Sequence, residues 1–152
     1  MFKTKSHFLL TKDEQIEIIE KIKSIENKTS GELRLAIRNK KNFFERKKTS
    51  KEVALKTFYA LNMHKTKDKT GVLLFILVGD KKLEIIADSG INEKVEKNVW
   101  ENFVFELSTY FIQNKFKEGI IVELEKIGNL LSQHFPQKEN DIDELSNEIS
   151  FS

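Results

Sequence analysis

The fold is decided by residues 71–90, which read GVLLFILVGDKKLEIIADSG. The apolar run at residues 72–78 does not alternate with polar residues, which is typical of a central strand covered on both faces. Turn-forming residues follow at 79–82, and residues 83–87 predict a strand that returns antiparallel to the first. This stretch therefore predicts a buried hairpin whose second strand ends at Asp88.

The residues before this hairpin predict a β-α-β unit. Thr11 and Glu14 form the sequence pattern of a capping box, which predicts a first helix over residues 13–27. Apolar residues alternate with polar or small ones over residues 33–37, as in a strand with one buried face. Residues 43–61 predict a second helix with a polar first part. A right-handed crossover would make the two strands that flank it parallel.

Two further helices follow the hairpin. The first opens near Asn92, with apolar residues at helical spacing through Leu107, and the second ends before Pro136. We expect a single domain over residues 1–136 and a polar, acidic tail over residues 137–152 that lies loosely on the surface. The predicted fold class is α/β, a three-layer α/β/α arrangement with a small mixed sheet of three to four strands in the order α-β-α-β-β-α-α.

Composition excludes several classes of function. The chain of 152 residues contains no cysteine, which excludes disulfides, thiolate zinc sites and cysteine nucleophiles. The longest apolar run is too short to span a bilayer, and the N-terminal sequence MFKTKSHFLL lacks the features of a signal peptide. We therefore expect a soluble, cytoplasmic protein without membrane insertion, and we expect it to be a monomer.

The predicted topology brings polar side chains together beside the end of the third strand. Asp88 would lie near the residues that precede the other two strands, and the next helix would open beside it. The predicted metal ligands are Asp88, Glu32, Asp68 and Glu93, and the other residues of this rim are Ser30, Thr70, Ser89 and Asn92. Such hard oxygen donors suit Ca²⁺ or Mg²⁺, and bound Mg²⁺ would orient a phosphate ester. The alternative is a turn with Asn92 as a helix cap.

A basic segment at residues 38–51 offers a different kind of function. It interleaves Phe43 and Phe44 with lysines and arginines, a composition that suits nucleic acid, a partner protein or lipid headgroups. Nucleic-acid binding is not expected, because the formal net charge of the chain is only +2. The alternative function is a non-catalytic protein-interaction module that uses this segment or the acidic tail.

Several stretches, taken in order, resemble the TPM domain family in its short, soluble, bacterial-type form. They are NKTSGELRLAI at 27–37, ALKTFYALNMHKTKDKTGVLLFILVGDKKLEIIADSGINEKV at 54–95, Trp100, FKEGI at 116–120 and FPQKENDIDEL at 135–145. The resemblance implies a compact mixed sheet with helices on both sides. It also implies a phosphatase-like protein that associates with a divalent metal. Residues 69–71 read Lys-Thr-Gly where many relatives have Arg-Asn-Gly.

Overall fold

Strand β2 (Gly71–Leu77) lies inside a four-stranded mixed sheet, and each of its residues is buried. It pairs parallel with β1 (Glu32–Arg38) and antiparallel with β3 (Lys82–Ala87). A short fourth strand, β4 (Ser150–Phe151), pairs parallel with the other side of β1. The strand order is therefore β3-β2-β1-β4, and the predicted parallel and antiparallel pairings are confirmed.

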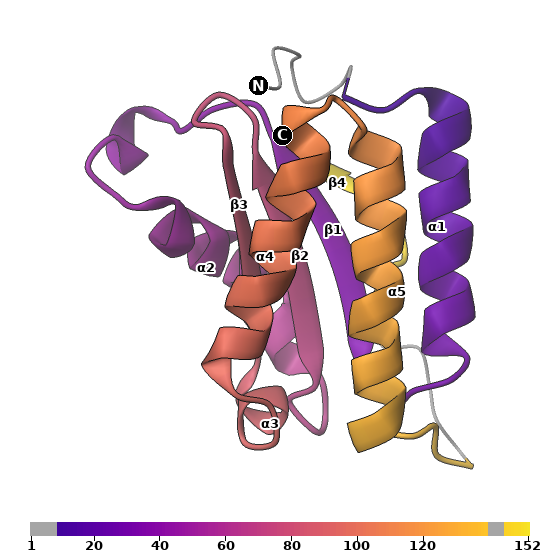
Figure 1. Cartoon of the computed structure of the whole chain (residues 1–152). Coiled ribbons are helices and arrows are strands. Elements are labelled where there is room, and N and C mark those ends of the chain that lie inside the picture. The colour runs from indigo at the N-terminus through magenta and orange to yellow at the C-terminus, as the bar shows by residue number, and fades with distance from the viewer. Residues whose placement is uncertain (1–8, 140–144) are drawn as a thin grey trace.

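Figure 1 presents the computed structural model of the chain, which describes residues 9–139 and 145–152. The helices and short 3-10 turns in chain order are α1 (Lys12–Glu26), η2 (Phe43–Glu45), α2 (Ser50–Ala60), η3 (Met63–Lys65), α3 (Ser89–Asn92), α4 (Lys97–Ile112) and α5 (Phe116–His134).

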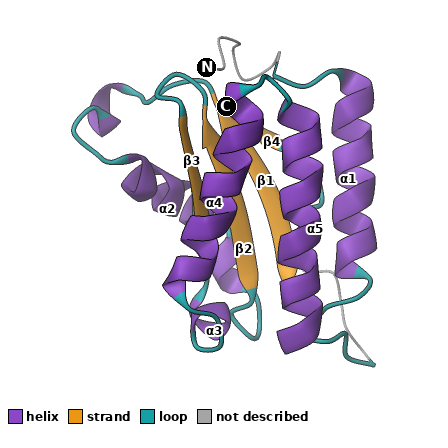
Figure 2. Cartoon of the chain, viewed as in Figure 1, coloured by secondary structure: helices purple, strands orange, loops and turns teal. Residues whose placement is uncertain are grey.

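Helices cover both faces of the sheet, as Figure 2 shows, with α2 on one face and α1, α4 and α5 on the other. The alternation of side chains along β2 explains this division. Leu73, Phe75 and Leu77 pack with Phe58 of α2, whereas the intervening apolar residues of β2 join the larger core beneath the other three helices. The predicted three-layer α/β/α fold class is confirmed.

Local signals explain where the first and last helices begin and end. In α1, the Glu14 amide donates to Thr11 Oγ1 at 3.1 Å, and the Thr11 amide donates to Glu14 Oε1 at 2.9 Å. These reciprocal bonds are the capping box that the sequence predicts, and they satisfy two backbone donors that would otherwise lack partners. Helix α5 ends at His134, two residues before Pro136, which cannot continue a helix because it has no backbone N–H.

Two predicted helix starts are wrong. The helix expected from residue 43 begins instead at Ser50, because Thr49 caps it and accepts from the Glu52 amide at 3.1 Å. The helix expected from near Asn92 is divided into α3 and α4. The side chain of Asn92 caps neither helix, because its Nδ2 donates at 2.7 Å to the carbonyl of Ala87.

The end of the chain is also more ordered than the sequence predicts. Residues 145–152 do not lie loosely, because Ile149 and Phe151 pack against the core beneath α1, α4 and α5. The Ser152 amide donates to the Ile37 carbonyl at 2.9 Å, and the Asn39 amide donates to the Ser152 carbonyl at 2.8 Å. Residues 140–144 of the predicted tail lie outside the described residues. In the described part of the chain, no helix has the length and apolarity needed to cross a membrane.

Phe151 provides a test of this C-terminal packing. We expect Phe151→Ala to lower the free energy of unfolding by about 1–3 kcal/mol, less than for a fully buried phenylalanine, because its side chain is only partly buried. Urea denaturation followed by circular dichroism measures this change. Glu148→Ala is the matched control, since Glu148 is exposed and the substitution should leave stability nearly unchanged. Equal stability of the two variants would contradict the packing of β4 against the core.

Candidate functional site

Three chain segments meet at one end of the sheet, residues 30–32, 68–71 and 88–93, and we call this region the acidic rim. The Glu32 amide donates to the Thr70 carbonyl at 3.0 Å. The Asp88 amide donates to the Gly71 carbonyl at 2.9 Å. The start of β1, the start of β2 and the end of β3 are therefore adjacent through backbone hydrogen bonds.

Asp88 occupies the corner of the acidic rim, where β3 ends and α3 begins. Its Oδ1 accepts from the Ser89 amide at 2.7 Å, which makes Asp88 the N-cap of α3. Its Oδ2 is buried and accepts no hydrogen bond from any of residues 9–139 or 145–152. Buried polar atoms in folded proteins almost always have a partner, and burial of a lone carboxylate oxygen is costly. This oxygen therefore has acceptor capacity that the described residues do not use.

Gly90 lets two backbone carbonyls approach the same corner. A Cβ built on Gly90 would overlap the carbonyl oxygen of Asp68 and would lie 2.6 Å from that of Lys69. No side chain fits in that space, so glycine is required for this close approach. Lys69 itself has a positive φ of 56°, which turns the loop sharply before β2. The carbonyl oxygens of Asp68 and Lys69 thus pack against Gly90, which follows Asp88 by two residues.

Glu32 is buried at the start of β1, with 3% of its surface exposed. Its Oε1 accepts from the Leu145 amide at 2.9 Å, and Leu145 packs against the core beside α2. Glu32 is therefore not a solvated charge at the end of a strand. This carboxylate is a fixed, internal group that ties the C-terminal segment to the acidic rim.

The two remaining predicted metal ligands are on the surface. Asp68 Oδ2 accepts from Lys138 Nζ at 2.6 Å, and this hydrogen bond, followed by the lysine charge, lowers the pKa of Asp68. Glu93 is exposed at the C-terminal end of α3. Within residues 9–139 and 145–152, no three histidine, aspartate or glutamate side chains are grouped so that they could hold a metal ion.

Three of the other four predicted rim residues form side-chain hydrogen bonds to backbone carbonyls. Thr70 is buried, and its Oγ1 lies 3.5 Å from the carbonyl of Ser30. The Ser30 amide donates to the carbonyl of Phe135 at 2.9 Å, which joins the end of α5 to the rim. Ser89 is exposed, and Asn92 holds the last carbonyl of β3. These residues shape the rim, and of the four only Ser89 and Asn92 are exposed to solvent.

At the opposite end of the sheet the structure reveals a buried carboxylate that sequence reasoning missed. Glu45 is fully buried, and its two oxygens accept from Arg38 Nη1 and Nη2 at 3.1 and 2.8 Å. Lys56 Nζ and the Asn42 amide also donate to it, at 3.2 and 2.9 Å. The hydrogen bond from Arg38 is the largest cause that lowers the pKa of Glu45, to about 2. The spacing of Asn42 and Glu45 is a capping-box pattern, which would have indicated the hydrogen bond from the Asn42 amide to the Glu45 side chain.

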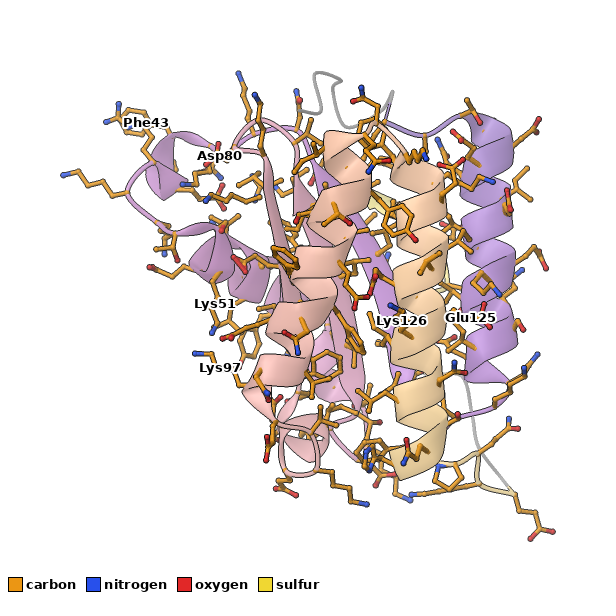
Figure 3. All side chains as sticks on the ribbon, viewed as in Figure 1. Phe43, Lys51, Asp80, Lys97, Glu125 and Lys126 are labelled. Carbon is orange, nitrogen blue, oxygen red and sulfur yellow. The ribbon has the colours of Figure 1, made fainter. Side chains whose placement is uncertain are left out.

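A second missed carboxyl group lies between α4 and α5. Glu123 is 1% exposed, and burial raises its pKa to about 8, with the adjacent carboxyl of Glu106 as a further cause. Lys126 forms an ion pair with Glu106 and lies 4.0 Å from Glu123 Oε1 (Figure 3 labels Lys126). Glu123 lies on the apolar stripe of α5, which is the signal that could have identified it.

A groove of about 830 Å³ runs along the outer edge of β3 between α2 and α4. Trp100 and Leu55 line it, and its lysines Lys51 and Lys97 come from opposite walls (Figure 3 labels both). The indole Nε1 of Trp100 is buried and donates to no atom in the described part of the chain. The groove extends to Asn92 but does not include Asp88, so it borders the acidic rim without forming it.

Comparison with known proteins gives two kinds of similarity. A family model described as the TPM domain matches residues 4–130. The BA42 protein from the psychrophilic bacterium Bizionia argentinensis has a solved structure that is 36% identical, with a TM-score of 0.83 over 94% of this chain and 95% of that chain. An N-terminal domain from a P. gingivalis protein is 12% identical, with a TM-score of 0.68 over 84% and 80%, and supports the fold alone. No curated protein matches.

Glu123 makes a prediction about the pH dependence of stability. Its pKa is raised in the folded state, so the folded protein holds this proton at pH values where the unfolded chain has released it. Its stabilising contribution is therefore present below about pH 4.5 and declines as the pH rises toward 8. We expect Glu123→Gln to remove this decline. Urea denaturation at pH 5 and pH 8 measures the change in the free energy of unfolding. An equal change in the original protein and in the Glu123→Gln variant would contradict the prediction.

Proposed function

We propose, since the chain belongs to the TPM domain family, that its acidic rim binds a divalent cation, Ca²⁺ or Mg²⁺. The observation that carries this proposal is Asp88 Oδ2, which is buried and accepts no hydrogen bond from the described residues. A cation would provide that oxygen with a partner. Carboxylate and backbone carbonyl oxygens are ligands that both ions prefer, and the carbonyls of Asp68 and Lys69 pack against Gly90, two residues after Asp88.

Within the acidic rim we assign different roles to the four predicted carboxylates. Asp88 and Glu32 are the proposed ligands, because both are held in place by backbone amides that donate to one of their oxygens. Asp68 and Glu93 are exposed and increase the negative potential around the rim. Lys138 Nζ donates to Asp68 Oδ2 and offsets part of that negative charge. One or two carboxylates with several waters is a common arrangement for Mg²⁺.

The proposal extends to hydrolysis of phosphate esters, which the word phosphatase in the name of the matching family model supports. A divalent cation at Asp88 would orient a phosphate ester and neutralise negative charge that develops during cleavage. The exposed side chains of Ser89 and Asn92 lie beside Asp88, where they could contact such a substrate. No side chain is assigned as a nucleophile.

The alternative function, a non-catalytic protein-interaction module, is not favoured by the comparisons. Part of its proposed surface is also engaged internally, because residues 145–152 of the acidic tail pack against the sheet. The cytoplasmic location and the monomeric state stay predictions.

Cation binding is testable by NMR titration of the amide resonances with Ca²⁺ and with Mg²⁺. We expect shift changes confined to residues 30–32, 68–71 and 88–93. Asp88→Asn combined with Glu32→Gln should weaken binding more than about tenfold, because both ligands lose their charge. The side-chain amide oxygen that Glu32→Gln introduces can still accept from the Leu145 amide, so the fold should persist.

The control for this titration is Asp80→Asn. Asp80 lies at the opposite end of the sheet, where its carboxylate is 3.1 Å from Lys41 Nζ (Figure 3 labels Asp80). This variant should bind the cation as tightly as the original protein. Equal affinity of the double variant and the original protein would disprove the ligand assignment.

Hydrolysis is tested on the same protein with p-nitrophenyl phosphate in the presence of Mg²⁺. We expect release of p-nitrophenol that chelation by EDTA abolishes and that Asp88→Asn lowers more than about a hundredfold, since a lost charge-stabilising group costs this order in rate. Asp80→Asn should retain full activity. If the titration detects cation binding but no p-nitrophenol is released, the site binds a metal without this catalysis.

A further inference from the structure

Two adjacent phenylalanines project from the connection between β1 and α2. Phe43 is 70% exposed and Phe44 is 82% exposed, and together with Phe105 they are the most exposed large apolar side chains of the described residues. Figure 1 shows that this connection stands away from the sheet and its covering helices, and Figure 3 places Phe43 at its outer end. Large exposed apolar side chains that lie together mark interaction surfaces.

Glu45 fixes the position of the turn that carries these rings. Its buried carboxylate is held by Arg38 from the end of β1 and by Lys56 from α2. The Asn42 amide also donates to it, which closes the short 3-10 turn that carries both phenylalanines. The two rings lie edge to face, with centroids 5.6 Å apart. The turn therefore presents both rings outward in a preorganised arrangement, and docking requires little further ordering.

Exposed cationic side chains come from the same connection and from the turn beside it. The Gly79 amide donates to the Asn39 carbonyl at 2.7 Å, which brings the turn between β2 and β3 beside this connection. The exposed cations from the two segments are Lys40, Arg46, Lys47, Lys48, Lys81 and Lys82. Within the described residues none of these six forms an ion pair, and the nearby acids, Asp80 and Glu45, are already paired. We call residues 40–48 with Lys81 and Lys82 the docking tip.

We propose that the docking tip binds the surface of an anionic lipid bilayer. The two phenylalanine rings would enter the boundary between headgroups and acyl chains, and the surrounding cations would contact lipid phosphates. Reversible membrane binding of this kind generally requires both buried apolar area and electrostatic attraction. The docking tip supplies both from one preorganised turn. This surface lies at the opposite end of the sheet from the acidic rim and does not depend on it.

The ring geometry favours a lipid surface over a nucleic acid. The guanidinium of Arg46 lies 4.5 Å from the centroid of the Phe43 ring and covers one of its faces. The Phe43 and Phe44 rings are nearly perpendicular, at 89°, so they do not offer parallel platforms for successive bases. Insertion of apolar rings into a bilayer requires no such platforms. Binding of single-stranded nucleic acid is therefore an outcome that the test must distinguish.

The test is co-sedimentation of the full chain with lipid vesicles in buffer that contains EDTA, so that no divalent cation contributes. We expect binding to vesicles of phosphatidylcholine mixed with phosphatidylserine and little binding to phosphatidylcholine alone. Raising the salt concentration should weaken binding, because it screens exposed charges. Asp88→Asn should have no effect, which separates this proposal from the proposed function of the acidic rim.

Matched variants separate the two contributions. Phe43→Ser should lower the partition coefficient more than about fivefold, whereas Phe105→Ser, at a position on α4 with the same 70% exposure, should not change it. Lys47→Glu combined with Lys48→Glu should lower it more than about twentyfold, since each lysine near an anionic surface contributes about fivefold. Lys97→Glu, at an exposed position on α4, is the charge control.

Two results would overturn the proposal. One is that the protein does not bind the vesicles, or that Phe43→Ser and Phe105→Ser reduce vesicle binding equally. The other is tighter binding of single-stranded DNA or RNA than of anionic vesicles, with the same dependence on Phe43. Phe44→Trp provides a second measurement, since insertion should shift its indole fluorescence to the blue when anionic vesicles are added, and an unchanged spectrum would contradict insertion.

Discussion

Burial of β2 on both faces is the constraint on which the rest of the structure depends. A strand in that position cannot leave backbone N–H or C=O groups unpaired, because no water reaches them. Strands β1 and β3 therefore have to flank it along its length, and helices have to cover it above and below. In this chain a parallel partner reached through α2 and an antiparallel partner reached through a short turn satisfy this requirement.

This arrangement gives the sheet two chemically different ends. At one end β1 and β2 begin while β3 finishes, so the loops there contribute Glu32, Asp68 and Asp88. At the other end β1 and β2 finish, and the connection to α2 lies beside the turn between β2 and β3. The acidic rim and the cationic docking tip are thus separated by the length of β2. A cation site at the acidic rim and an anionic membrane at the docking tip can coexist, because salt screens the electrostatic potential of each region over that distance.

Elements that carry their own periodicity could be predicted from the sequence, and elements that depend on distant partners could not. Helix α1 and strands β2 and β3 have capping, turn and apolar signals within their own residues. Strand β4 has none, because Ser150–Phe151 is two residues long and pairs with β1 more than a hundred positions earlier. In the site, topology predicts that the end of β3 lies beside the starts of β1 and β2, and the backbone hydrogen bonds of Asp88 and Glu32 confirm this. The pairing of Asp68 with Lys138 depends on a contact across 70 positions, which no local pattern indicates.

The contrast between two carboxylates separates structural from functional acids. Glu45 is buried, but each of its oxygens accepts hydrogen bonds, from Arg38 among others, and its negative charge is fully compensated. Such a group stabilises local structure and has no capacity left for a ligand. Asp88 uses one oxygen as a helix cap and leaves the other buried without a partner in the described part of the chain. The incomplete compensation of Asp88 is therefore the reason to place the proposed cation there.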